Sequence, residues 1–315
     1  MAKLLLGLGE LDEGRVKELL DAARGLEVVC TEDKEQMVNN ADEVEVAARV
    51  PASVISSLPN LKWYHNWFAG VEHLVDKEPF ASGQAVLTNA SGTHAEPMAE
   101  QFFAMLLAYS RNLPAFVRAQ QRREWLHGSM EDVFELDGKR LLIVGFGAIG
   151  SRIAELGSAF GMDVVGVRRS PDQSDRVPTV TPEALFDELA KADVVVNVAP
   201  LTPATERLFD RRAFERMKEG CIFSNFGRGK SVDQDALIEA LSNNQIAAAL
   251  LDVTEPEPLP ADSPLWEMQN VLICPHTGGW TPRYLERTWP IFIENVRRYV
   301  DGSPLTNRID IAAKY

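Results

Sequence analysis

The chain has 315 residues, 45% of them hydrophobic, and carries a formal net charge of −14 at pH 7. This length suits two domains, each with its own core, better than one. So acidic a chain lacks the basic footprint of a nucleic-acid-binding protein, and local arginines would have to attract any anionic ligand. No apolar run approaches the length of a membrane-spanning helix. We therefore expect neither a nucleic acid nor a membrane as a partner.

Three cysteines, Cys30, Cys221 and Cys274, lie far apart, each in an apolar strand-like run. An odd, scattered set of this kind predicts reduced core thiols and no disulfide framework or metal site. The first residues turn acidic too early for a secretory signal. We accordingly expect a cytoplasmic protein without a bound metal.

The first ninety residues alternate strand-like and helical runs, which predicts a small α/β unit with a parallel sheet. A helical pattern of apolar residues spans 13–23. The runs rich in β-branched and aromatic residues, read as strands, are 3–8, 26–31, 43–48, 61–68 and 85–90.

A long helical stretch, 94–125, follows, and we expect Pro114 to break it. A second α/β series then begins, with strands expected at 140–145, 163–168, 193–198, 221–224, 247–252 and 271–274. Thr-Pro pairs at 181–182, 202–203 and 281–282 predict three helix starts, with Thr as N-cap and Pro in the first turn.

The last helix is expected at about 282–300, and the strand-like tail 306–311 should return to the first domain. The fold class is therefore α/β, with two Rossmann-like or flavodoxin-like domains and an active site in the cleft between them. The predicted domains are 1–93 plus 289–315, and 94–288.

The segment "VGFGAIG" places Gly145, Gly147 and Gly150 between a strand-like run and a helical one. Glycines at this spacing allow a tight turn and let the backbone approach a pyrophosphate at the helix N-terminus. An ordinary strand-to-helix turn is the alternative. The flanking pattern favours a dinucleotide site.

A dinucleotide site usually has an acidic residue at the end of the next strand, where it holds the adenosine ribose. Here that position is occupied by Arg168, Arg169 and Ser170. Guanidinium and hydroxyl donors suit a 2′-phosphate, so NADP is favoured and NAD remains possible. A solvated pair of surface arginines is the alternative.

Four further candidates lie at or just after the ends of three successive predicted strands: Arg228, Asp252, Glu257 and His276. The carboxyl ends of parallel strands share one edge of a sheet, so these loops can converge. Each residue also has a plain alternative: a surface ion pair, a stiff proline-rich loop or a structural histidine. Glu255 competes with Glu257 on chemistry alone.

The order and spacing of these motifs resemble the D-isomer-specific 2-hydroxyacid dehydrogenases, including members that reduce glyoxylate or hydroxypyruvate with NADPH. The shared landmarks are the glycine turn, "APLTPATERLF" (199–209), "NFGRGK" (225–230), "LDVTEPEPL" (251–259), "PHTGG" (275–279) and "FAGVEHL" (68–74). The resemblance covers essentially the whole chain. It implies NADPH-dependent reduction of a small 2-oxo acid to the D-2-hydroxy acid.

The resemblance also implies a role for each matching residue. Arg228 would bind the substrate carboxylate, His276 would be the general acid and base, and Glu257 would fix the tautomer of His276 and favour its imidazolium. The first domain would bind substrate and the second the dinucleotide. Further substrate contacts would come from Gly70 and Val71, and further cofactor contacts from Ala148, Ile149, Pro200, Thr205 and Asp252.

Members of the family form homodimers through the element matching 94–125, and some relatives act as corepressors. A homodimer is therefore expected. A dinucleotide-binding corepressor, or a redox sensor of the same fold without turnover, is the alternative function.

Five aromatic residues are expected mainly in cores or interfaces: Trp63, Trp67, Phe68, Trp280 and Trp289. Three of them, Trp67, Phe68 and Trp280, are also placed to line a substrate pocket.

Overall fold

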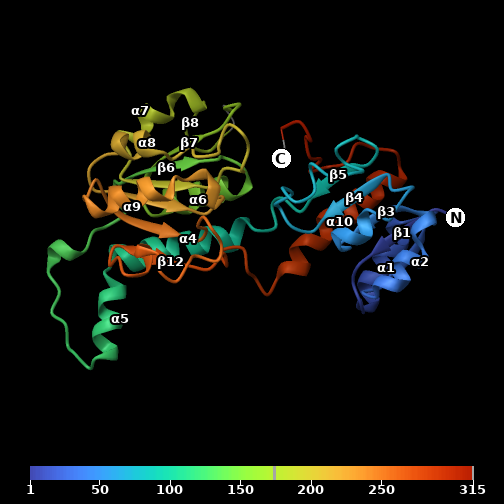
Figure 1. Cartoon of the computed structure of the whole chain (residues 1–315), viewed down its shortest axis with the longest axis horizontal. Helices are drawn as coiled ribbons and strands as arrows, with labels where there is room; N and C mark the ends of the chain where they lie inside the picture. Colours follow the sequence, from blue (N-terminus) through green and yellow to red (C-terminus); the bar gives the residue numbers. More distant parts are fainter. Residues whose placement is uncertain (173–174, 314–315) are drawn as a thin grey trace. The chain divides into compact units, whose positions relative to one another are not determined.

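The computed structural model describes residues 1–172 and 175–313. The chain divides into two compact units, one formed by Met1–Thr93 with Thr281–Tyr315 and the other by His94–Trp280 (Figure 1). The predicted second boundary at 289 lies too late in the chain. All of helix α10 (Tyr284–Val300) belongs to the first unit because its apolar face, including Trp289 and Phe292, is buried in that unit's core.

The first unit contains a parallel five-stranded sheet in the order β2-β1-β3-β4-β5. This is the flavodoxin-like order, and it confirms the predicted α/β class for this unit. The strands are β1 (Lys3–Leu6), β2 (Glu27–Cys30), β3 (Val44–Ala48), β4 (Trp63–Asn66) and β5 (Val86–Asn89). The helices are α1 (Glu13–Ala22), α2 (Lys34–Asn39), η1 (Ala41–Glu43), α3 (Ala52–Ile55) and α10.

Aromatic side chains fill the core of the first unit on the α10 side of the sheet. Trp63, Trp67 and Trp289 are buried there around Phe292, so the expectation that Trp67 lines a pocket is wrong. Among the aromatics singled out from the sequence, Phe68 and Trp280 are exposed. These two are the side chains that remain accessible to a ligand.

His65 is also enclosed in this core. Its Nδ1 lies 2.8 Å from the Thr88 hydroxyl, which also accepts a hydrogen bond from the Trp63 indole. Burial lowers the pKa of His65 to about 3. The imidazole is therefore neutral in the folded protein at ordinary pH.

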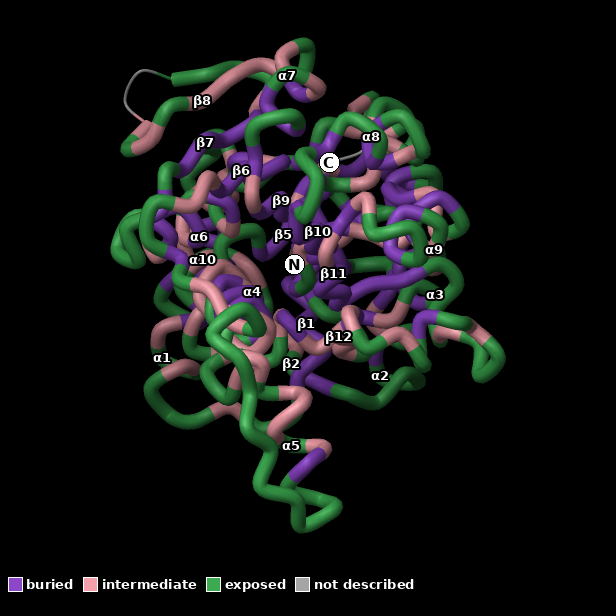
Figure 2. The backbone as a smooth tube through the Cα atoms, turned by 90° about the vertical axis from the view of Figure 1, so that its left-hand side faces the viewer, coloured by how far each residue is buried: buried purple, intermediate pink, exposed green. Residues whose placement is uncertain are grey.

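The second unit contains a parallel seven-stranded sheet in the order β12-β11-β10-β9-β6-β7-β8. Counted from its first strand, this is the Rossmann order with one added edge strand. The strands are β6 (Arg140–Val144), β7 (Asp163–Val167), β8 (Thr179–Val180), β9 (Val194–Asn197), β10 (Cys221–Asn225), β11 (Ile246–Leu251) and β12 (Val271–Ile273). Figure 2 shows that the strand segments are largely buried.

Helices of this unit lie on both faces of the sheet (Figure 1). The α-helices are α4 (Ala95–Ser110), α5 (Leu113–Gln121), α6 (Ala148–Ala159), α7 (Leu185–Leu189), α8 (Arg211–Arg216) and α9 (Gln234–Ser242). The short 3-10 turns are η2 (Met130–Asp132), η3 (Pro182–Ala184), η4 (Gly229–Ser231) and η5 (Pro264–Trp266).

Several predicted helix boundaries are wrong. The long helical stretch breaks at Asn112, whose φ of 54° is left-handed, whereas Pro114 lies within the first turn of α5, where no N–H is needed. Thr202 starts only a turn, and α8 begins later with Asp210 as its N-cap. Thr181 precedes a 3-10 turn, and α10 begins after Arg283, not after Thr281.

The tail returns to the first unit, as expected, through a single antiparallel bridge between Thr88 and Arg308. The cysteines only partly match their prediction. Cys221 is buried and Cys274 is half-buried, but Cys30 is exposed on the edge strand β2. No helix in the described ranges is long and apolar enough to cross a membrane.

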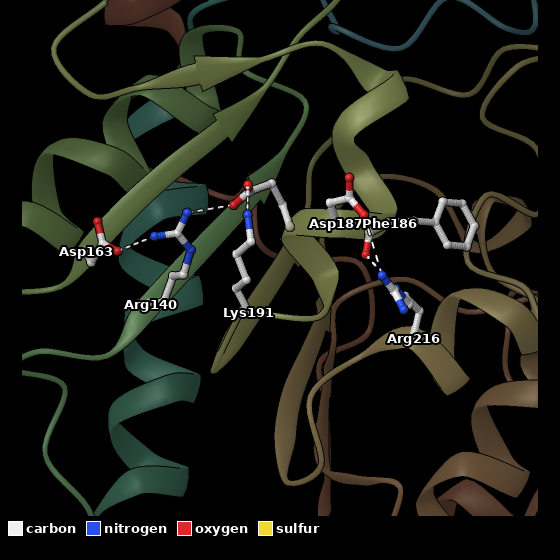
Figure 3. Close-up of polar contacts among 7 residues, drawn as sticks. Arg140, Asp163, Phe186, Asp187, Lys191 and Arg216 are labelled. Carbon is white, nitrogen blue, oxygen red and sulfur yellow. Dashed lines mark hydrogen bonds and ion pairs between the residues drawn. The ribbon is translucent and has the colours of Figure 1, made fainter.

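An ion-pair cluster joins the amino-terminal edge of the second sheet to α7 (Figure 3). Arg140 at the start of β6 pairs with Asp163 at the start of β7, and its Nη2 lies 2.6 Å from the carboxylate of Glu188. Lys191 lies 2.7 Å from the same carboxylate. Burial opposes ionisation of Glu188, but the hydrogen bonds from Arg140 and Lys191 outweigh it and lower its pKa.

Candidate active site

The candidate residues of the second unit lie along one edge of its sheet because of the strand register. Val167, Val144 and Asn197 are paired across adjacent strands, and the row continues through Asn225, Leu251 and Ile273. The chain leaves every strand at this row. The loops that follow therefore begin side by side, and they carry Gly145, Arg168, Arg228, Asp252 and His276.

These loops touch through glycines. A Cβ on Gly229 would lie 1.9 Å from the carbonyl oxygen of Thr254. The loop that carries Arg228 (226–230), called the arginine loop below, therefore packs directly on the segment that carries Glu257. A Cβ on Gly278 would lie 2.7 Å from Oδ2 of Asp252. The loops after β10, β11 and β12 are thus in van der Waals contact, as their motifs predicted.

His276 and Glu257 form a direct pair, with Nδ1 of the imidazole 2.9 Å from Oε2 of the carboxylate. An ionised carboxylate only accepts hydrogen bonds, so Nδ1 carries the proton and Nε2 is left as the exchangeable nitrogen. Both side chains are partly exposed, at 52% for His276 and 38% for Glu257. Glu257, the partner that the resemblance implied, contacts His276, whereas the backbone N–H of Glu255, its competitor on chemistry alone, donates to Gln234.

Asp252 fixes the backbone that presents His276. Its Oδ1 accepts hydrogen bonds from the N–H groups of Thr277 and Gly278, at 3.0 and 2.9 Å. His276 itself has a left-handed φ of 55°, which is costly for a residue with a side chain and needs such support. Burial raises the pKa of Asp252. Within the described residues, no group of three or more His, Cys, Asp or Glu is placed to hold a metal ion.

Arg228 lies in a tight loop whose polar supports the sequence reasoning missed. Its Nη1 donates to the carbonyl oxygen of Gly227 at 2.9 Å. The carbonyl oxygen of Arg228 accepts from the buried side chains of Asn225 and Ser231, and both of these accept from the amide of Asn197. Polar residues in otherwise apolar strand ends are the signal that could have identified them.

The glycine turn has the shape that a dinucleotide needs. Gly145 has a φ of 99°, and a Cβ there would lie 2.5 Å from the amide nitrogen of Ala199. Gly147 precedes α6, and a Cβ on it would meet no atom within 4 Å. No side chain caps α6, so the N–H groups of its first turn, at Ala148, Ile149 and Gly150, face the space in front of the helix. These residues fit a pyrophosphate.

Arg168 follows β7, as predicted, and is held by an acidic partner. Its Nη1 lies 2.9 and 3.1 Å from the two carboxylate oxygens of Asp175, which also accepts from the Thr179 hydroxyl. Arg169 and Ser170 are exposed beside it. The donor set suits an anionic group on a ribose.

Pro200 and Thr205 lie in one turn after β9. The Thr205 hydroxyl donates to the carbonyl oxygen of Pro200 at 2.6 Å. The same hydroxyl accepts from the N–H of Thr202 at 2.8 Å. The turn is therefore ordered by its own side chains and lies next to the glycine turn through Ala199.

In the first unit, Gly70 and Val71 follow β4 in a loop whose carbonyl oxygens accept hydrogen bonds from two asparagine side chains. The Asn66 amide donates to the carbonyl oxygens of Phe68 and Gly70, at 2.8 and 2.9 Å, and the Asn89 amide donates to that of Ala69 at 2.7 Å. Sequence reasoning missed both asparagines. With the carbonyl oxygens engaged on one side, the loop can offer its N–H groups to an anion.

A Rossmann-ordered sheet, a glycine turn after its first strand and an imidazole–carboxylate pair on the same edge are the combination that the sequence motifs predicted. The model of the D-isomer specific 2-hydroxyacid dehydrogenase, NAD binding domain, matches residues 103–278. The chain belongs to the D-isomer specific 2-hydroxyacid dehydrogenase family.

Three proteins are similar to this chain in sequence or in structure. The glyoxylate reductase of Aeropyrum pernix is 33% identical over 270 residues, which are 83% of this chain and 80% of that protein. A D-isomer specific 2-hydroxyacid dehydrogenase from Xanthobacter autotrophicus Py2, solved with NADPH and MES, superposes with a TM-score of 0.82 at 31% identity, over 100% of this chain and 99% of that one. The NADPH-dependent glyoxylate/hydroxypyruvate reductase of Sinorhizobium meliloti, solved with NADP and sulfate, gives 0.83 at 26%, over 100% of both chains.

Proposed function

We propose that the protein is an NADPH-dependent reductase that converts a small 2-oxo acid to the D-2-hydroxy acid. Family membership and the relatives support 2-hydroxyacid dehydrogenase activity in general. The observation that carries the proposal is the 2.9 Å contact between His276 and Glu257, next to the arginine loop and on the sheet edge that bears the glycine turn.

In the proposed mechanism, Arg228 binds the substrate carboxylate and draws electron density from the 2-oxo group. Nε2 of His276 donates a proton to the carbonyl oxygen during reduction and accepts it in the reverse direction. Glu257 keeps the proton on Nδ1 and stabilises the imidazolium. The bound dinucleotide supplies hydride chemistry. Gly70 and Val71 are proposed as further backbone contacts of the carboxylate.

The cofactor site is proposed to hold the pyrophosphate at Gly145, Gly147, Ala148, Ile149 and Gly150. Pro200 and Thr205 would line the path toward the nicotinamide, and Asp252 would contact its carboxamide. The preference for NADPH over NADH rests on Arg168, Arg169 and Ser170, which lie where an acidic residue would otherwise bind the ribose. The NADPH and NADP complexes of the two structural relatives support this preference.

We also infer a homodimer, since α5 and the segment after it extend away from the sheet of the second unit (Figure 1). Apolar side chains on this arm are exposed, with Trp125 at 87% and Met130 at 91%. A second copy of the chain is the partner that would cover them, and light scattering in solution tests this. A cytoplasmic location stays a prediction, motivated by the unpaired cysteines.

The experiment that tests the function follows nicotinamide absorbance while purified protein meets a panel of 2-oxo acids with NADPH or NADH. Oxidation of NADPH with a small 2-oxo acid is the expected result. Preference for NADH would keep the reductase and overturn the 2′-phosphate assignment. Tight NADPH binding with no turnover of any acid would favour the corepressor or sensor function.

A further inference from the structure

Three buried polar side chains gather beneath the arginine loop. Asn197 ends β9, Asn225 ends β10, and Ser231 lies in η4. Their exposed fractions are 0%, 1% and 1%. Proteins bury such groups only when their hydrogen-bonding atoms are satisfied, so each has to be accounted for by its partners.

The partners of these three residues form a connected network. The Asn197 amide nitrogen donates to Oδ1 of Asn225 at 3.0 Å and to the Ser231 hydroxyl at 2.8 Å. Oδ1 of Asn197 accepts from the N–H of Ala199 at 3.2 Å. The network therefore also reaches the loop that packs against the glycine turn.

Three further hydrogen bonds join Asn225 and Ser231 to the backbone of the arginine loop. The carbonyl oxygen of Arg228 accepts from the amide of Asn225 at 3.1 Å and from the hydroxyl of Ser231 at 2.6 Å. The N–H of Gly227 donates to Oδ1 of Asn225 at 3.1 Å. The main chain is thus tied down on both sides of the Arg228 Cα.

Close packing on both sides limits how far the loop can move. A Cβ on Gly227 would lie 2.7 Å from the carbonyl oxygen of Ala199, and one on Gly229 would lie 1.9 Å from that of Thr254. An apolar filling of the same space could stabilise the fold as well as a polar network does. The polar network differs from such a filling because its bonds end on specific backbone atoms, the carbonyl oxygen of Arg228 and the N–H of Gly227.

We propose that Asn197, Asn225 and Ser231 are positioning residues for Arg228, holding its guanidinium where the carboxylate of the 2-oxo acid binds. This inference rests on the proposed function, because it concerns the substrate-binding role of Arg228. The three side chains act through the backbone and do not touch the substrate.

The test compares Ser231→Ala with Ser224→Ala. Both remove one buried hydroxyl that donates to a backbone carbonyl, but the Ser224 hydroxyl donates to Leu250 at 3.0 Å, outside the network. We expect Ser231→Ala to lower kcat/KM for the 2-oxo acid by about 10- to 100-fold, the effect of a misplacement of about 1 Å. NADPH affinity should be unchanged, and Ser224→Ala should keep normal kinetics.

A double-mutant cycle separates positioning from stability. In an Arg228→Ala background, Ser231→Ala should cause no further loss of kcat/KM. A loss of the same size in both backgrounds, or equal kinetics for the two serine variants, would overturn the proposal while leaving the reductase intact. If Arg228→Ala itself leaves turnover unchanged, the proposed role of Arg228 fails and the inference falls with it. Asn225→Ala, which removes three bonds of the network, two of them to the backbone of the arginine loop, should give a larger loss than Ser231→Ala, which removes one bond to that backbone.

Discussion

Glu257 is held at both carboxylate oxygens, since Oε2 contacts Nδ1 of His276 at 2.9 Å and Oε1 accepts from the N–H of Thr254 at 3.2 Å. A carboxylate fixed in this way can hold only one tautomer of the imidazole. It leaves Nε2 of His276 as the nitrogen that can exchange a proton with a ligand.

This pairing makes a kinetic prediction for the reductase. His276→Ala should lower kcat by about 10²–10⁴-fold, the usual contribution of a positioned proton donor. Glu257→Gln should lower kcat by less, because the imidazole remains but its cation loses a stabilising charge. Steady-state kinetics measure both. Glu255→Gln is the matched control, and an equal loss in the two glutamine variants would contradict the assignment.

Arg168 should distinguish NADPH from NADH. Replacing Arg168 with alanine removes charged hydrogen-bond donors worth about 1.5–3 kcal/mol, which corresponds to roughly 10- to 100-fold weaker NADPH binding. Binding of NADH should barely change, and Arg169→Ala should act in the same direction. Fluorescence titration of both dinucleotides measures the two dissociation constants.

Arg176→Ala is the control for this measurement. Arg176 is 83% exposed in the same segment and pairs with Glu155 at 3.6 Å. Its removal changes the net charge equally, so an NADPH-specific loss there as well would indicate a general charge effect. Equal losses for NADPH and NADH in Arg168→Ala would show that Arg168 does not bind a 2′-phosphate.

Glu188 should contribute to stability and not to catalysis, because it lies in α7 and pairs with Arg140 at the start of β6, at the opposite edge of the sheet from the candidate site. We expect Glu188→Gln to lower the free energy of unfolding by about 1–3 kcal/mol, since Arg140 loses a buried charge partner. Asp187→Asn, whose side chain is 75% exposed, should cost less than about 0.5 kcal/mol. Urea unfolding measures both.

The Glu188 contribution also has a defined pH dependence. Its pKa is lowered from an ordinary value of 4.5, so the stabilisation is intact above that pH and is lost as the pH falls through the folded-state pKa. The difference between wild type and Glu188→Gln should therefore shrink in acid. A difference independent of pH would contradict an ionic origin.

His65 should make the first unit sensitive to mild acid. Its pKa is about 3 in the folded chain against an ordinary 6.5, so the unfolded chain binds the proton more readily. Stability is intact above about pH 6.5 and falls below it, by up to about 1.4 kcal/mol per pH unit. Urea unfolding between about pH 7 and pH 5 should give a steeper slope for wild type than for His65→Asn.

The matched control is His127→Asn, because His127 is exposed. That variant should keep the wild-type slope. If His65→Asn also keeps it, another buried group accounts for the acid sensitivity.

The sequence predicted the positions of most strands well. The strands of both sheets lie where the β-rich runs indicated, because most of them are buried and leave apolar runs. The exception is β8, which was not predicted, since its two residues, Thr179 and Val180, form no such run. Helix starts were less predictable. Thr202-Pro203 has the composition of a helix start, yet only a turn forms there and the chain reaches a left-handed φ of 49° at Arg207. Helix α8 begins after Asp210, whose side chain accepts from the N–H of Ala213.

The sequence alone determined the residue types of the candidate site and their order, because each motif follows the end of a strand and parallel strands share an edge. Only the tertiary structure decided which atoms meet. It brought Glu257, the glutamate that the family resemblance implied, to 2.9 Å from His276. It also paired Arg168 with Asp175, and linked Asn197 through Asn225 to the backbone of Arg228. These contacts join residues from different strands and loops, and strand register and loop packing, which no local pattern encodes, set their distances.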